Sequence, residues 1–118
     1  MKQNQFVKAY LTVQSHENDK LPLNVSYAFY KLKKNLQTQW DFQVEKEREI
    51  MEKYHPTTNE QGMYQFESDE ARSNFGKELT DLAQLEVPMD FDKVHIDMSS
   101  EINFSVAEIE ALDEFIEF

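Results

Sequence analysis

Residues 25–54 read VSYAFYKLKKNLQTQWDFQVEKEREIMEKY, and this stretch decides the fold. Its apolar residues recur at spacings of three, four or seven, which predicts one buried face of a long α-helix: Val25, Phe29, Leu32, Leu36, Trp40, Val44, Met51 and Tyr54. Asn24 or Ser26 is suited to cap the start of the helix, and Pro56 ends it. At 1.5 Å per residue the helix is roughly 40–45 Å long. A small domain cannot cover all of it, so we expect it to project or to pair with a second helix.

A second helix is predicted to follow at about 69–85. Ser68 is a good N-cap and is followed by two acidic residues, which favour the positive end of the helix dipole. The apolar stripe of this helix consists of Ala71, Phe75, Leu79, Leu82 and Leu85. Because the connection is short, the two helices should run antiparallel. Gly62 in the connection is available for a positive φ, and Gly76 indicates either close helix–helix approach or simple tolerance.

The remaining segments predict short strands and a third helix. Residues 6–13, FVKAYLTV, alternate in the manner of a strand, and further strands are expected at about 63–67 and 93–98. Ser105 and Glu108 stand at capping-box spacing. They mark the first turn of a short amphipathic helix, whose apolar residues are Val106, Ile109, Leu112, Phe115 and Ile116. The prediction is a single α+β domain over residues 1–118, with a small β-sheet and a projecting helical arm at about 25–85.

Composition excludes several classes of protein. The 118 residues contain no cysteine, so disulfides, thiolate zinc sites and cysteine nucleophiles are ruled out. The chain has only two glycines, far apart, whereas a loop that cradles phosphate needs several close together. No stretch approaches the roughly 18 apolar residues that span a bilayer. We therefore expect neither a nucleotide site nor membrane association, and a cytoplasmic or virion-associated location.

The net charge of -11 is unevenly distributed. Residues 1–55 contain nine basic and seven acidic residues, whereas residues 56–118 contain three basic and sixteen acidic residues. The acidic half repels phosphate, so direct nucleic-acid binding is not expected there. The negative charge of this half can attract a basic protein surface, imitate nucleic acid, or merely keep the protein in solution.

The sequence shows no catalytic or cofactor signature. The best group of potential metal ligands is Asp90, Asp92, His95 and Asp97, but Lys93 shares their strand face and would oppose a cation. The many carboxylates lie on predicted helix faces among other carboxylates, and nothing singles out a buried pair. We expect a protein that is not an enzyme and binds no metal or cofactor.

Exposed aromatic and charged residues indicate protein–protein contacts instead. Trp40 and Phe42 lie two apart on a helix, so either one faces a partner or both enter the core from opposite sides. Tyr30 lies beside Lys31, Lys33 and Lys34, and basic residues with aromatic ones can indicate nucleic-acid binding. Three lysines spread over more than one helix face favour instead compensation of the acidic half in this chain or a neighbouring subunit, so we do not expect direct nucleic-acid binding. The candidate interaction residues are Tyr30, Trp40, Phe42, Glu78, Asp81, Glu110, Asp113 and Glu114.

The order of these features resembles a known family over about residues 21–118. The matching elements are LPLNVSYA from residue 21, a lysine-rich helix with ERE at 47–49, a loop containing Gly62, the run Phe75, Glu78, Leu79, Leu82, and the terminal Ser105, Leu112, Phe115. This pattern is similar to a family of small uncharacterised proteins encoded by phages and prophages of Gram-positive bacteria. The family loop usually reads Asp-Glu-Asp-Gly, and TNEQG at 58–62 replaces it here, which removes any argument for a loop cation. The resemblance implies a virion or assembly accessory, or a factor that binds a host protein.

Two functional hypotheses follow. The first is a non-enzymatic interaction or assembly protein that uses the two-helix arm, as a homo-oligomer or with a host or phage protein. The second is a nucleic-acid mimic that inhibits a DNA-binding or defence protein. Its phosphate-like row would consist of Glu67, Asp69, Glu70, Glu78, Asp81 and Glu86, extended by Glu108, Glu110, Asp113, Glu114 and Glu117.

Overall fold

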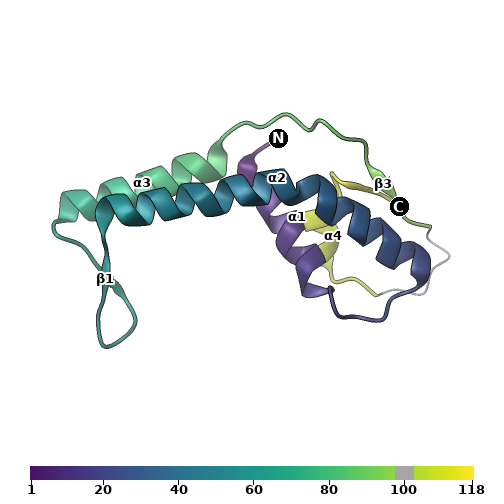
Figure 1. The fold of residues 1–118 in the computed structure, drawn as a ribbon, viewed down its shortest axis with the longest axis horizontal. Helices are drawn as coiled ribbons and strands as arrows, with labels where there is room; N and C mark the ends of the chain where they lie inside the picture. Colours follow the sequence, from purple (N-terminus) through teal and green to yellow (C-terminus); the bar gives the residue numbers. More distant parts are fainter. Residues whose placement is uncertain (98–102) are drawn as a thin grey trace.

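The chain adopts an elongated α+β fold. A computed structural model describes residues 1–97 and 103–118, with principal extents of 55 × 33 × 21 Å. The helices are α1 (Gln3–Ser15), α2 (Leu23–Tyr54), α3 (Asp69–Gln84) and α4 (Val106–Leu112). The strands are β1 (Thr57–Thr58), β2 (Tyr64–Gln65), β3 (Val94–His95) and β4 (Ile116–Glu117). Figure 1 shows α2 as the spine, with α1 against its first half and α3 along its second half, and α4 packs on α1.

Helix α2 confirms the predicted long helix and is continuous over 32 residues. Its cap differs from both predicted candidates, because Pro22 occupies the N-cap position. The carbonyl of Pro22 accepts hydrogen bonds from the backbone N–H groups of Val25 and Ser26, at 3.0 and 2.9 Å. The Ser26 hydroxyl instead donates to the carbonyl of Leu21 at 3.3 Å. At the other end His55 adopts a left-handed conformation with φ 42°, just before Pro56.

The predicted strand at 6–13 is wrong, because this segment lies within helix α1. The buried residues of α1 are Gln3, Phe6, Ala9, Tyr10 and Val13, which follow a helical period. The segment also has an alternating pattern, with Val7, Ala9, Leu11 and Val13 at every second position, but packing against α2 selects the helix. Gln3 is fully buried, and its side-chain amide donates to the backbone carbonyl of Gln39 at 3.0 Å. This bond fixes the start of α1 against the middle of α2.

Helix α3 confirms the predicted second helix and its antiparallel packing. The Ser68 hydroxyl accepts a hydrogen bond from the backbone N–H of Ala71 at 3.0 Å, as expected of an N-cap. Gly62 has the expected positive φ, 77°. Gly76 has open space around the position that a Cβ would occupy, so close helix–helix approach does not explain it.

The tip of the arm has a small aromatic core of its own. Phe75 of α3 is buried, and its ring centroid lies 4.9 to 6.2 Å from three other rings, those of Tyr54, Tyr64 and Phe66. These residues come from the end of α2, from β2 and from the segment before α3. Together they join the hairpin β1–β2 to the two helices of the arm.

The described strands form two separate pairs and not the single small sheet that we predicted. Strands β1 and β2 pair antiparallel, and β3 pairs with β4 in parallel. Strand β3 lies within the predicted strand at 93–98, of which Met98 falls outside the described residues. The predicted C-terminal helix ends early, at Leu112, because Ile116 enters β4. The backbone N–H groups of Val94 and Ile96 donate to the carbonyls of Phe115 and Glu117, both at 2.9 Å.

The main core lies at one end of the molecule, which we call the body. It is built from α1, the first half of α2, the segment at 87–96 and the C-terminal segment. The second half of α2, the β1–β2 hairpin and α3 form the arm (Figure 1). The radius of gyration is 17.4 Å, whereas a compact chain of this length has a radius of about 13–14 Å. The arm accounts for this elongation.

Candidate functional site

The predicted interaction residues fall into several environments. Trp40 is half-buried, and its ring stacks on Tyr10 with centroids 4.6 Å apart and an interplanar angle of 9°. Phe42 is also half-buried, with the Lys46 ammonium 5.7 Å from its ring centroid. Trp40 therefore packs against the core through α1, whereas Phe42 contacts Lys46 one turn further along its own helix. Tyr30, by contrast, is 61 % exposed.

Tyr30 belongs to an exposed row on α2 that we call the tyrosine–lysine face, consisting of Leu23, Tyr27, Tyr30 and Lys31. Leu23 is 86 % exposed and Tyr27 is 59 % exposed. The rings of Tyr27 and Tyr30 stack with centroids 6.3 Å apart, and the Lys31 ammonium lies 5.4 Å from the Tyr27 centroid. The positions 23, 27 and 30 have helical spacing and therefore share one side of α2, away from its buried residues. Only Tyr30 was among our predicted candidates, although this spacing is visible in the sequence.

Three predicted acidic residues form a second surface in the body, which we call the C-terminal acidic face. It consists of Glu110, Asp113 and Glu114, all of them exposed. Glu110 lies on α4, and the other two lie in the turn between α4 and β4. Glu110 and the C-cap residue Asp113 are three positions apart at the end of α4, a spacing that brings side chains to one side of a helix, and Glu114 follows in the turn.

The other two predicted residues, Glu78 and Asp81, line a hollow of about 460 Å³ on the arm, between α2 and α3. Glu78 forms an ion pair with Lys53 at 3.1 Å. Contact with the Tyr54 hydroxyl and with Lys53 lowers the pKa of the Glu78 carboxyl. The hollow also contains Lys46 and Glu49. Because cations and carboxylates alternate here, the hollow has no dominant charge, and its ion pair serves to join the two helices.

Ion pairs within the chain also interrupt the proposed phosphate-like row. Glu78 pairs with Lys53, and Glu86 pairs with Lys2 at 2.7 Å and with the N-terminal ammonium at 3.1 Å. Glu108 pairs with His16. A carboxylate bound to a cation contributes little to the field that a mimic of nucleic acid needs. The uncompensated acidic residues of the predicted row are concentrated near the start of α3 and on the C-terminal acidic face.

The contact between His16 and Glu108 was not foreseen, and it connects the two ends of the chain. His16 follows α1, and its Nδ1 lies 2.7 Å from a carboxylate oxygen of Asp19. Its Nε2 contacts Glu108 of α4, which is 92 positions away in the sequence. The imidazole also packs against the rings of Phe29 and Phe104, each with centroids 5.8 Å apart. We call His16, Asp19 and Glu108 the histidine latch.

The electrostatics of the histidine latch favour its charged form. The hydrogen bond to Glu108 raises the pKa of His16 above 6.5, against the opposing effect of burial, and Asp19 raises it further. In return, His16 lowers the pKa of Glu108 below 4.5, with help from the backbone of Ser105. The two carboxylates therefore favour the protonated, imidazolium form of the His16 ring.

This arrangement predicts a pH-dependent contribution to stability. The contribution of His16 is complete below its ordinary pKa of 6.5 and is lost as the pH rises through the raised pKa. The contribution of Glu108 is present above its ordinary pKa of 4.5 and is lost as the pH falls through the lowered pKa. Glu108→Gln should therefore lower the free energy of unfolding by about 1–2 kcal/mol at about pH 5.5 and by much less at about pH 9. Urea unfolding at the two pH values measures the difference.

The substitution by glutamine isolates the charge. Glu108 also accepts from the backbone N–H of Ser105 at 3.1 Å in a capping box, and glutamine preserves that bond. Asp113→Asn removes an exposed charge nearby and should have no comparable effect at either pH. An equal loss for Glu108→Gln at both pH values would show that the latch is not an ion pair.

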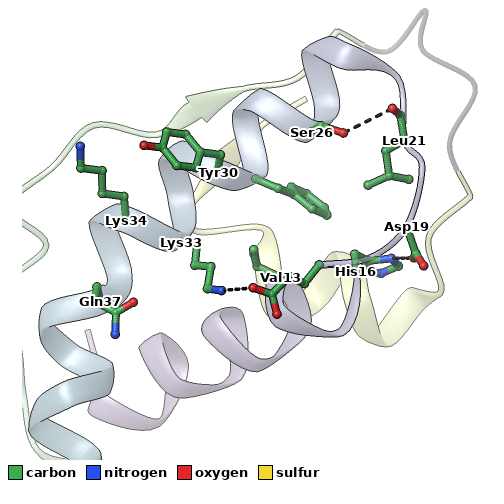
Figure 2. A pocket seen from close by; sticks show the side chains of 11 residues that line it. Val13, His16, Asp19, Leu21, Ser26, Tyr30, Lys33, Lys34 and Gln37 are labelled. Atoms are coloured by element: carbon green, nitrogen blue, oxygen red, sulfur yellow. Dashed lines mark hydrogen bonds and ion pairs between the residues drawn. The ribbon is translucent and has the colours of Figure 1, made fainter.

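A pocket of about 540 Å³ lies beside the histidine latch, between α2 and the end of α1 with its following loop (Figure 2). Its lining consists of Val13, His16, Glu17, Asp19, Leu21, Ser26, Phe29, Tyr30, Lys33, Lys34 and Gln37. Tyr30 thus borders both this pocket and the tyrosine–lysine face. The pocket could not be predicted from the sequence, because it depends on how the end of α1 and the α1–α2 loop are placed relative to α2.

Other kinds of site are not formed by the described residues. Within residues 1–97 and 103–118, no group of three or more His, Asp or Glu side chains is placed to hold a metal ion. In the same part of the chain, no helix is both long and apolar enough to cross a membrane. Comparison of the chain with protein families, with curated proteins and with solved structures found no match.

Proposed function

We propose that this is a non-enzymatic interaction protein that assembles with further copies of itself, in the phage-encoded setting that its resemblance implies. In this proposal the tyrosine–lysine face of one copy binds the C-terminal acidic face of a second copy. The arm extends from this contact, and its tip is available to a further phage or host protein.

The observation that carries the proposal is the row of large exposed side chains on α2. Leu23, Tyr27 and Tyr30 are each more than half exposed and adjacent on one helix face. Tyrosine is enriched at the energetically important positions of protein interfaces. A contiguous exposed row of this kind on a helix is typical of a surface that docks onto another protein.

Charge complementarity supports a second copy as the occupant. Lys31 lies on the tyrosine–lysine face, with Lys34 one turn further along α2. The C-terminal acidic face carries three exposed carboxylates in the half of the chain whose net charge is -13. Two different faces that bind each other give a closed dimer, in which the contact between the faces is made twice, or an open filament if the rotation does not close.

Size-exclusion chromatography with light scattering tests the proposal. At low ionic strength we expect a mass of at least twice the 14.0 kDa of the chain. Leu23→Ser combined with Tyr27→Ser should return the mass to that of the monomer, because it removes the apolar anchors. Lys31→Glu should weaken association about fivefold or more, and so should Asp113→Lys, because each places like charges across the contact. Combining the two reversals should restore association.

Lys77→Glu serves as the matched control, because Lys77 is an exposed lysine on α3 in the arm. It should leave the mass unchanged. A strictly monomeric protein at low salt and high concentration would contradict the proposed self-association. Capture of a DNA-binding protein by that monomer, with loss of capture on neutralising residues 67–70, would favour the nucleic-acid mimic instead.

A further inference from the structure

The pocket beside the histidine latch has an apolar floor and polar edges. Its floor includes Val13 and Phe29, which are 4 % and 5 % exposed, together with the half-buried Leu21. Its volume of about 540 Å³ lies within the usual range for small-molecule sites, about 300–1,000 Å³. A floor that combines an aromatic ring with branched aliphatic side chains suits a flat apolar group.

The carboxylates on one edge of this pocket are already compensated. Glu17 accepts from the Lys33 ammonium at 2.7 Å, and Asp19 lies 2.7 Å from the His16 ring. Figure 2 shows the contact between His16 and Asp19 beside the α1–α2 loop, and the Lys33 side chain pointing from α2 toward the end of α1. Because Glu17 is paired with Lys33 and Asp19 is bonded to the His16 ring that it shares with Glu108, this edge offers little attraction to a cationic ligand.

The opposite edge presents donors without such compensation. Lys34 lines the pocket and forms no ion pair with the part of the chain that the structure describes. Tyr30 lies four residues earlier on the same face of α2. An ammonium beside a phenolic O–H can bind a carboxylate or another oxyanion.

We propose that this pocket binds a small organic anion with a flat apolar body. The apolar body lies on Phe29, Val13 and Leu21, and the anionic group binds the Lys34 ammonium and the Tyr30 hydroxyl. Tyr30 belongs to both this site and the tyrosine–lysine face, so a bound anion also places a charge next to the surface used for assembly. This inference goes beyond the proposed self-association and does not depend on it.

Three indole probes separate the contributions of shape and charge: indole-3-acetate, 3-methylindole and tryptamine. They share a ring and carry a negative, a zero and a positive charge. Titrations of ¹⁵N-labelled protein are followed by NMR on the variant that combines Leu23→Ser with Tyr27→Ser, so that self-association does not interfere. We expect indole-3-acetate to bind about fivefold more tightly than 3-methylindole, and tryptamine to bind most weakly. The largest amide shifts should occur in residues 13–21 and 26–37.

Lys34→Gln should weaken binding of indole-3-acetate about fivefold and leave 3-methylindole unchanged. Lys31→Gln is the matched control, because Lys31 is an exposed lysine of the same helix that does not line the pocket. Ser26→Leu tests the site itself, since a larger side chain at this half-buried lining position should abolish binding of all three probes.

Equal affinity for the three probes, equal effects of Lys34→Gln and Lys31→Gln, or shifts confined to the arm would overturn the proposal. The absence of amide shifts with every probe at millimolar concentration would also overturn it. None of these outcomes bears on the mass measured by light scattering, so failure of this site and failure of the proposed assembly are distinguishable.

Discussion

Thr38→Pro is expected to lower the free energy of unfolding by about 3 kcal/mol or more relative to Thr38→Ala. Thr38 is exposed and lies in the middle of α2, where the helix passes from the body into the arm. Proline at this position removes the N–H that donates to the carbonyl of residue 34, and its ring clashes with that carbonyl. Urea unfolding followed by far-UV circular dichroism measures the loss.

Thr38→Ala is the control for removing the side chain. Alanine has the highest helix propensity, so this variant should equal or slightly exceed the wild-type stability. Small-angle scattering provides a second measurement, since a kink at residue 38 changes the direction of the arm relative to the body. If the proline variant kept both the wild-type stability and the wild-type radius of gyration, α2 would not be the rigid continuous element described above.

The continuity of α2 also bears on the proposed assembly. The same helix forms one wall of the core and carries the tyrosine–lysine face. Its second half supports the arm (Figure 1). Both halves are covered within the chain, the first by α1 and the second by α3. Length alone therefore does not require a partner. The case for one depends on the exposed row of Leu23, Tyr27 and Tyr30, and not on an uncovered helix.

The elements that the sequence predicted correctly are those specified by local signals. The helical period of residues 25–54 identifies α2, and the Ser68 hydroxyl caps α3 as expected. Ser105 and Glu108 form the predicted capping box at the start of α4. Each of these features depends on residues within a few positions of one another, so the sequence contains all the information needed.

The features that the sequence did not reveal depend on distant contacts. Residues 6–13 satisfy both a strand and a helix period, and only the presence of α2 beside them decides between the two. Strand β4 forms because it pairs with the segment at 94–96. In this pairing Ile116 lies beside Val94, which is 22 positions earlier in the sequence. The histidine latch joins residues 92 positions apart. No local pattern specifies such pairs.

The same distinction applies to the candidate surfaces. Exposure of Tyr30 follows from its position opposite the buried stripe of α2. Trp40 was also predicted as a candidate for contact with a partner protein, but the Tyr10 ring of α1 stacks on it. Since α1 was predicted as a strand, this contact could not be foreseen. An error in one element therefore changed the interpretation of a residue 30 positions away.

Phe115→Ala is expected to lower the free energy of unfolding by about 3–5 kcal/mol. The Phe115 side chain is 1 % exposed, and its ring lies 5.3 Å from that of Phe6 in α1 and 6.2 Å from that of Phe91. Truncation removes the transfer free energy of the ring and leaves a cavity where three separate segments meet. Equilibrium urea unfolding measures the change.

Phe118→Ala is the matched control, because Phe118 is an aromatic residue of the same segment and is 36 % exposed. It should lower the free energy of unfolding by about 1 kcal/mol or less. The comparison decides whether the C-terminal segment is part of the core. If Phe115→Ala had an effect as small as Phe118→Ala, residues 106–118 would be separable from the body. The C-terminal acidic face would then have no fixed position relative to the tyrosine–lysine face, and the proposed two-faced assembly would lose its geometric basis.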